Sequence, residues 1–149
     1  MDDLRLLLWK AGRTVSRHYR ARVAQMDLTA GQATALLLLA ESPGCTLGSL
    51  AQGLGTDLAT TSTMVDRLMS ATLVRRETDQ ADRRRALLFP TEKALGLTTQ
   101  LETARRETAI YLRDLLGEDR AHLLADLLRQ LIDQVEKNPE VVEEKVVGI

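Results

Sequence analysis

"TLGSLAQGLGTDLATTSTMVDRLMSATLVRRETDQADRRRALLFPTEKA", residues 46–94, contains two helix signals and two strand signals in close succession. Thr46 precedes a short apolar-periodic run that Gly55 stops, and Asp57 precedes a second run. Thr and Asp are favoured just before a helix, and glycine is frequent just after one. The stretch therefore predicts short helices at residues 46–54 and 58–71 joined by a tight turn, which is a helix-turn-helix.

Two short strand candidates follow these helices, LVRRE at residues 73–77 and RALLFP at residues 85–90, with the polar sequence TDQADR between them. This pattern predicts a β-hairpin with an exposed tip. Pro90 lies at the end of the second strand, where its missing N–H matters least. A helix-turn-helix followed by such a hairpin is a winged helix.

The flanking sequence is helical. Apolar spacing predicts helices at residues 4–26, from Thr29 to about Ser42, from Thr91 to about Leu116, and at 119–137. We therefore expect a mainly α fold with a small β-hairpin wing, in which a winged helix-turn-helix part is joined to a helical platform.

Composition and the N-terminal sequence indicate the cellular compartment of the protein. The 149-residue chain has a formal net charge of −1 and a single cysteine, Cys45, so no disulfide forms within one chain. The N-terminus lacks the order of a signal peptide, and the longest strictly apolar run, residues 35–40, is far too short to span a membrane. These features predict a soluble, cytoplasmic protein with no membrane partner.

Nothing in the sequence supports an enzyme. His18 and His122 are far apart and there is one cysteine, so no metal-binding pattern is visible. No nucleophile–base set, glycine-rich phosphate loop or carboxylate pair stands out, and we expect no cofactor.

At this point residues 28–39, "LTAGQATALLLL", and residues 46–94 resemble the MarR (multiple antibiotic resistance regulator) family of bacterial transcription factors. The most specific feature is Asp82-Arg83-Arg84 at its distance from Val65-Asp66-Arg67-Leu68, followed by Thr-Glu-Lys at the start of a long helix. The resemblance covers roughly residues 5–136. The chain departs from the family at Thr63, where arginine is frequent, and at Pro90 and Ala94, where Leu and Gly are usual.

The resemblance implies a single MarR-like chain, residues 1–149. Residues 28–92 are the expected winged helix-turn-helix DNA-binding part, residues 4–26 and 93–137 the dimerisation part, and residues 138–149 a tail. The leucine-rich stripes of the platform exceed what one winged helix needs, so we expect them to bury against a second copy. The implied function is a ligand-responsive repressor that binds pseudo-palindromic operator DNA as a homodimer.

Helix 58–71 is expected to lie in the major groove of double-stranded DNA. Its periodicity directs one set of residues inward: Leu58, Thr61, Met64, Val65 and Leu68. The predicted DNA-contacting residues are Ala59, Thr60, Ser62, Thr63 and Arg67. Without the nearby arginines, these threonines would only indicate a solvated face.

The arginine run at residues 83–85 is expected to reach the adjacent minor groove, whose negative potential suits arginine. Asp82 is placed to hold the Arg84 guanidinium in a fork. By resemblance Arg84 is the inserted residue, with Arg83 and Arg85 nearer the backbone. Arg75 and Arg76, on the first strand, are secondary phosphate candidates. The alternative is a solvated loop balanced by Glu77, Asp79 and Asp82.

Many relatives bind small, often aromatic and anionic effectors between the platform and the winged helix. The residues in that region are Trp9, Arg13, Arg17, His18 and Tyr19. Aromatic residues on a long helix are more often core or interface than ligand site.

Two alternatives stay open. The first is a redox-sensing regulator that uses Cys45, although sensing cysteines of such relatives lie near the start of the first helix and a small packing residue is the favoured interpretation. The second is a winged helix that serves as a protein-interaction module without DNA binding.

Overall fold

Helix boundaries follow the capping residues that the sequence offers. The structure is a computed structural model and describes residues 3–138. Helix α1 (Leu4–Val23) begins after Asp3, whose carboxylate accepts the Leu6 N–H, and it continues into a 3-10 turn, η1 (Ala24–Met26). Helix α2 (Ala30–Glu41) begins at Thr29, which forms a capping box with Gln32. The predicted helix starts at the N-terminal half are therefore confirmed.

The helix-turn-helix is formed by α3 (Leu47–Leu54) and α4 (Leu58–Ser70). Thr46 and Asp57 accept backbone N–H groups at the two helix starts. Gly55 ends α3 with φ of 63°, a left-handed conformation that glycine adopts without steric cost. Both helices match their predicted ranges within one residue.

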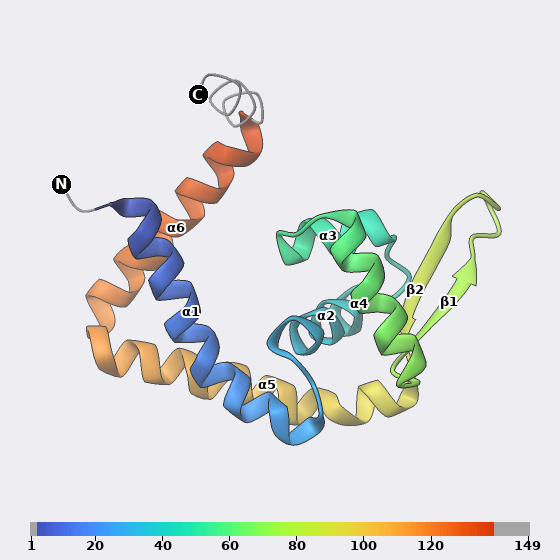
Figure 1. Cartoon of the computed structure of the whole chain (residues 1–149), viewed down its shortest axis with the longest axis horizontal. Helices are drawn as coiled ribbons and strands as arrows, with labels where there is room; N and C mark the ends of the chain where they lie inside the picture. The colour runs from blue at the N-terminus through green and yellow to red at the C-terminus, as the bar shows by residue number, and fades with distance from the viewer. Residues whose placement is uncertain (1–2, 139–149) are drawn as a thin grey trace. The chain divides into compact units, whose positions relative to one another are not determined.

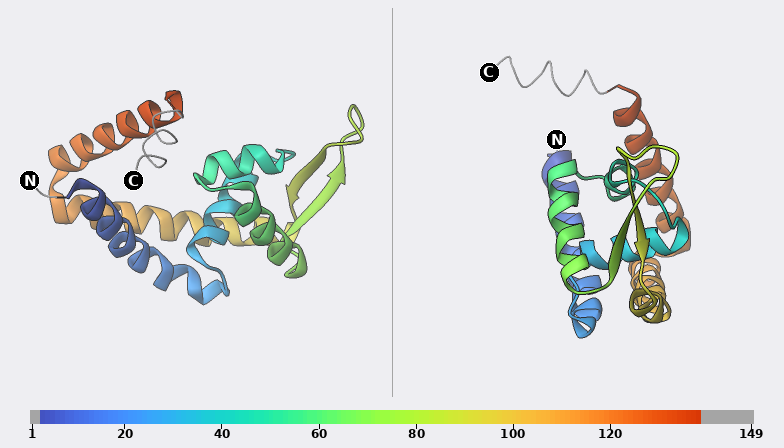
Figure 2. Two further views of the ribbon diagram at one scale, coloured as in Figure 1. Left: turned by 45° about the horizontal axis from the view of Figure 1, so that its top comes forward. Right: turned by 90° about the vertical axis from the view of Figure 1, so that its right-hand side faces the viewer.

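The hairpin consists of β1 (Val74–Thr78) and β2 (Ala86–Pro90), which pair antiparallel from Val74↔Pro90 to Thr78↔Ala86. The loop before α3 adds a short third partner, because Gly44 N–H donates to Leu88 O at 2.8 Å and Leu88 N–H donates to Cys45 O at 2.9 Å. The middle of β2 is thus fixed to the α2–α3 loop. Its tip projects away from the helices in Figure 1 and in the left view of Figure 2.

Two helices complete the described chain. Helix α5 (Glu92–Leu116) begins after Thr91, whose Oγ1 accepts the Ala94 N–H, and α6 (Glu118–Lys137) follows Gly117. The chain forms two compact units, Met1–Thr108 and Ala109–Ile149, so their boundary lies within α5. The mainly α fold with a β-hairpin wing is confirmed, whereas the predicted tail lies outside the described residues apart from Asn138.

The first unit has one apolar core, and α2 lies at its centre, packed against α1, α3 and β2. Its largest fully buried apolar side chains are Leu36, Leu39, Leu50, Leu68, Leu88, Leu101, Val23 and Val65. They come from every helix of the unit and from the second strand, so the wing and the helix-turn-helix share one core. Burial of each leucine contributes about 1.5–3 kcal/mol relative to exposure.

In the second unit, α6 has no buried residue. Its apolar side chains form an exposed stripe made of Leu123, Leu124, Leu127, Leu128, Leu131, Ile132 and Val135. Within residues 3–138 no single helix is long and apolar enough to cross a membrane, and the pair Leu4–Met26 and Ala30–Glu41 reaches that length only across a bend of 75°.

Candidate nucleic-acid interface

Asp57 organises the first turn of α4. Its carboxylate accepts the Thr60 backbone N–H at 2.7 Å and the Thr60 hydroxyl at 2.9 Å. These hydrogen bonds hold the pKa of the exposed Asp57 carboxyl below its ordinary value. The start of α4 therefore carries a fixed negative charge at neutral pH, and the Thr60 hydroxyl proton is already used within the protein.

The predicted DNA-contacting stripe of α4 is solvent-accessible. Ala59, Thr60, Thr63 and Arg67 are exposed, and Ser62 is half-buried. Thr63 donates its hydroxyl to Ala59 O at 3.1 Å, which leaves its oxygen free to accept. Arg67 forms no ion pair within the part of the chain that the structure describes. Arg67 is thus a positively charged hydrogen-bond donor on this face with no acidic partner in the described chain.

Leu58 corrects the face assignment. Thr61, Val65 and Leu68 are fully buried, as periodicity predicts, but Leu58 is 57% exposed. Leu58 is the first residue of α4, and helical side chains tilt toward the N-terminus. Its side chain therefore points beyond the start of the helix and stays largely exposed, although a helical wheel places it on the buried face.

A pocket of about 290 Å³ joins the α4 stripe to the start of α2. Thr60, Thr63 and Arg67 line it from α4, and Thr29 and Gln32 line it from α2. The N-terminus of a helix attracts anions. Sequence reasoning identified Thr29 only as a cap, because local spacing marks a helix start without showing which face of the fold that start meets.

Two aspartates shape the wing tip. Asp79 Oδ1 accepts the Ala81 N–H at 2.9 Å, and Asp82 Oδ1 accepts the Arg84 N–H at 3.0 Å. The predicted fork from Asp82 to the Arg84 guanidinium is therefore wrong: the carboxylate bonds the backbone two residues on. Asp residues commonly do this in tight turns, because the turn leaves N–H groups unsatisfied.

The arginines of the wing differ in their partners. Arg83, Arg84 and Arg85 are exposed, and none of them pairs with an acid within residues 3–138. On β1, Arg75 pairs with Glu77 and stacks on the Phe89 ring with its Cζ 4.6 Å from the ring centroid. Arg76 lies 4.0 Å from Asp66 on α4.

These contacts neutralise part of the charge of β1 and leave the tip arginines free. The wing arginines without an acidic partner in the described chain are thus those at residues 83–85.

A hollow of about 450 Å³ lies between the helix-turn-helix and the wing. Arg76 and Arg85 line it from the wing, Ser62 from α4, and Leu47 and Gly48 from the first turn of α3. Two guanidinium groups near the positive end of a helix suit a phosphate group. Sequence reasoning did not include Leu47 and Gly48, because neither has a polar side chain.

The predicted effector residues differ in their surroundings. Trp9 and Arg13 are exposed and stack on each other, with Arg13 Cζ 5.1 Å from the ring centroid, and Arg17 is also exposed. His18 lies 3.3 Å from the Thr108 hydroxyl. Thr108 donates its proton to Ala104 O, so its oxygen accepts from His18 Nδ1.

Tyr19 lines a pocket of about 260 Å³ with Leu37, Leu38 and Arg105, and Thr108 lies at its edge. Burial raises the pKa of the half-buried Tyr19 hydroxyl, so this group is a neutral hydrogen-bonding group at physiological pH. The pocket combines an apolar wall and a phenol with the Arg105 guanidinium and the Glu41 carboxylate, which suits a small aromatic ligand that carries polar groups.

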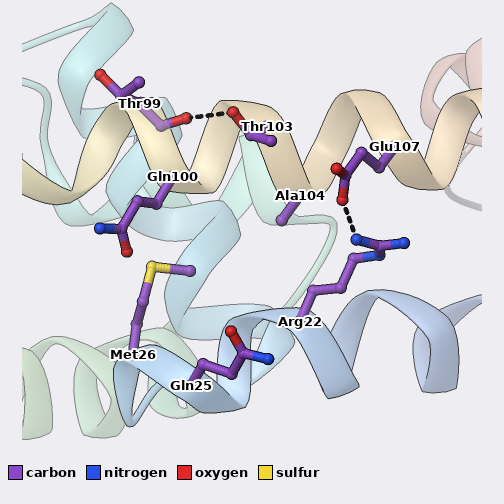
Figure 3. Close-up of a pocket in the computed structure, with 8 residues that line it drawn as sticks. All are labelled: Arg22, Gln25, Met26, Thr99, Gln100, Thr103, Ala104 and Glu107. Atoms are coloured by element: carbon purple, nitrogen blue, oxygen red, sulfur yellow. Dashed lines mark hydrogen bonds and ion pairs between the residues drawn. The ribbon is translucent and has the colours of Figure 1, made fainter.

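A second, more polar pocket of about 430 Å³ lies between the end of α1 and α5 (Figure 3). Arg22 and Glu107 form an ion pair at one end, and the amides of Gln25 and Gln100 line the other. The positive charge of Arg22 is already balanced by Glu107. Arg105 of the Tyr19 pocket is likewise balanced, by Glu41 and Glu102, so the two pockets differ chiefly in the apolar wall of the Tyr19 pocket.

Cys45 is a free thiol in the loop that holds β2. Burial raises its pKa, and a protonated thiol is a poor nucleophile. Among residues 3–138 no three His, Cys, Asp or Glu side chains cluster in a way that would hold a metal ion.

Comparison with known proteins places this site in a family. The pattern of the MarR family matches residues 28–86, which contain α2, the helix-turn-helix and the wing. The HTH-type transcriptional regulator TtmR of Methylorubrum extorquens (strain PA1) is 30% identical over 101 residues. The match covers 68% of this chain and 52% of TtmR, so this chain spans about half the length of that relative.

Solved structures share the fold over nearly the whole chain. A MarR protein from Peptoclostridium difficile is 25% identical, with 95% of this chain and 94% of that chain covered and a TM-score of 0.84. BpsR of Bordetella bronchiseptica, whose DNA binding is regulated by 6-hydroxynicotinic acid, is 23% identical (89% and 94% covered, TM-score 0.82). A mutant MarR from E. coli, complexed with operator DNA, is 24% identical (87% and 94% covered, TM-score 0.80).

Proposed function

Because the chain belongs to the MarR family, we propose that it is a sequence-specific DNA-binding transcriptional regulator of the cytoplasm. It binds pseudo-palindromic operator DNA as a homodimer and represses the genes beside it until a small effector releases it. The observation that carries this proposal is the exposed arginine run at residues 83–85, which has no acidic partner in the described chain. The operator complex of the E. coli MarR mutant supports the same mode of binding.

Each part of the interface has a role in this proposal. Helix α4 enters the major groove, where Arg67 donates to a base edge or phosphate and Thr63 accepts. The wing places Arg84 in the adjacent minor groove. A phosphate occupies the hollow between Arg76 and Arg85. The protein thereby contacts both grooves of one half-site.

A second copy supplies the other half-site. One wing and one α4 neutralise few phosphates, so a single half-site gives weak binding. The exposed leucine stripe of α6 is the surface that we assign to the partner copy. A two-fold dimer requires two inverted half-sites in the operator.

The test of DNA binding is a gel-shift titration against the DNA that flanks the protein's own gene, with excess competitor and at two salt concentrations. We expect a specific complex that weakens as salt rises. Arg84→Ala removes the minor-groove contact and is expected to weaken binding about tenfold. Lys137→Ala, which removes an exposed charge at the end of α6, is the matched control and is expected to change little.

Failure of this experiment has two forms. If the flanking DNA gives no specific complex, selection from random sequences shows whether the operator lies elsewhere. If selection also returns no sequence although the protein is folded and dimeric, the protein is an interaction module and the proposal is wrong.

We assign the effector to the pocket that Tyr19 and Arg105 line, because this pocket combines an apolar wall with a phenol and a guanidinium. Arg105 contacts Glu41 at 3.7 Å and Glu102 at 2.7 Å, and a ligand carboxylate would compete for its guanidinium. A small aromatic acid that binds there would contact α1, α2 and α5 at the same time.

The first probe is 6-hydroxynicotinic acid, which regulates the structural relative BpsR, in a set of single-ring aromatic acids. The readout is release of a labelled operator. Arg105→Met is expected to abolish release while it leaves DNA binding intact, and Arg106→Met on the exposed neighbouring position is the control. If Arg105→Met responds as the wild type does, this pocket is not the effector site.

A further inference from the structure

The end of α4 is held by the first turn of α5. Lys93 Nζ donates to Ala71 O at 2.9 Å and lies 3.4 Å from Thr72 Oγ1. Thr91 donates its hydroxyl to Thr72 O at 2.7 Å, and its backbone N–H donates to Leu73 O at 3.0 Å. Two residues at the start of α5 therefore bond three successive residues just after α4. We call Thr91 and Lys93 the α5 clamp.

The end of α4 needs an external partner. Helices often end at a glycine in the left-handed region, but here Thr72 occupies that region with φ of 58°. A β-branched residue is disfavoured there, so surrounding contacts must hold it. The ammonium of Lys93 also satisfies a terminal carbonyl of the α4 segment and complements the negative end of its dipole.

The same helix carries the DNA-contacting stripe. A helix of 13 residues moves as a rod, so a shift at its end changes the position of Thr63 and Arg67 as well. Base readout needs side chains placed to within about half an ångström. Because of this requirement we infer that Thr91 and Lys93 are positioning residues for operator recognition, although neither lies on the stripe. This inference rests on the proposed function.

The clamp also gives α5 a second role. Lys93 and the effector-pocket residue Arg105 lie on one helix, twelve residues apart, which corresponds to about 18 Å along its axis. A ligand that displaces α5 at Arg105 therefore acts on the end of α4 through Lys93. The sequence "TEK" at residues 91–93 thus links the effector pocket to the DNA-contacting helix.

A direct contact between Lys93 and a DNA phosphate is the competing explanation, and salt dependence separates the two. Each phosphate contact that is lost reduces the slope of log K against log salt concentration by about one. A positioning residue weakens operator binding and leaves this slope unchanged.

The experiment compares Lys93→Met and Lys93→Gln with the wild type, using the full-length protein and a duplex obtained by random-site selection. Lys93→Arg tests rescue, because arginine donates to the same carbonyl. Lys10→Met, an exposed lysine on α1, is the control for loss of one charge. The readouts are dissociation constants for the selected and a random duplex, the salt slope, the melting temperature and hydrogen exchange of amides 69–73.

We expect Lys93→Met and Lys93→Gln to bind the selected duplex about three- to tenfold more weakly. Binding to the random duplex and the salt slope stay the same, amides 69–73 exchange faster, and Lys93→Arg restores most of the affinity. Lys10→Met behaves as the wild type.

Unchanged affinity for the selected duplex overturns the clamp while the proposed function stands. A reduced salt slope overturns it in favour of a phosphate contact. Equal weakening on both duplexes also overturns it. If the wild type selects no duplex, the proposed function fails and the role of the clamp in recognition fails with it.

Discussion

At the scale of single residues, aspartates set the shape of the interface. Asp57 fixes the first turn of α4, and Asp79 and Asp82 fold the wing tip through backbone N–H groups. Each carboxylate accepts backbone N–H groups, that of Asp57 also the Thr60 hydroxyl, and none of them pairs with an arginine. The arginines at residues 83–85 consequently keep their charge available for a partner.

The Asp57 cap predicts a pH dependence. Its folded pKa lies below the ordinary value of 3.8, chiefly because of the hydrogen bond from the Thr60 N–H. A lowered folded pKa means that the stabilisation is complete above the unfolded pKa and is lost as pH falls through the folded pKa. We expect Asp57→Asn to be less stable than the wild type at pH 7, and the difference to shrink below about pH 4. Urea unfolding between pH 3 and pH 7 measures it.

Asp66→Asn is the control, because Asp66 is an exposed acid on the same helix that caps nothing. A difference between Asp57→Asn and the wild type that stays constant down to pH 3 would contradict the cap.

At the scale of elements, the wing depends on the loop before α3. Gly44 has φ of 82°, and a Cβ added there would lie 3.1 Å from Phe89 Cζ. Gly44→Ala is therefore expected to destabilise the protein by about 1–3 kcal/mol, since the left-handed conformation and the close ring both oppose a side chain. Because Gly44 and Cys45 hold Leu88 of β2, we also expect faster hydrogen exchange in the hairpin.

Gly96→Ala is the opposite case in the same unit. Gly96 lies within α5 with nothing within 4 Å of an added Cβ, so alanine is expected to stabilise the helix by up to about 1 kcal/mol. Equal effects of the two substitutions in thermal unfolding would show that the Gly44 turn is not constrained.

At the scale of the whole molecule, α6 is amphipathic yet buries none of its residues. Leu127→Glu places a charge in its apolar stripe and is expected to convert a dimer to a monomer in sedimentation. Operator affinity is then expected to fall about 100-fold or more, because two linked half-sites bind far more tightly than one.

Gln130→Glu is the matched control, since Gln130 is an exposed polar residue of α6 outside the apolar stripe. If Leu127→Glu stays dimeric, the stripe of α6 is not the surface that pairs two copies.

The sequence alone determined where the elements lie. Thr29, Thr46, Asp57 and Thr91 mark helix starts through local hydrogen bonds, and Gly55 marks an end through its own conformational freedom. Such signals act within four residues, so they are readable without a fold. The arginine run at residues 83–85 was likewise visible as a local excess of charge.

Only the tertiary structure decided which groups those elements bring together. It exposed Leu58 at a helix end, turned the Asp82 carboxylate to the backbone, and placed Tyr19, but neither Trp9 nor Arg13, in the lining of the 260 Å³ pocket. It also joined the start of α5 to the end of α4, about 20 residues earlier in the chain. These contacts depend on how far apart folded segments lie and on which hydrogen-bonding groups remain unsatisfied, and neither quantity is encoded in local spacing.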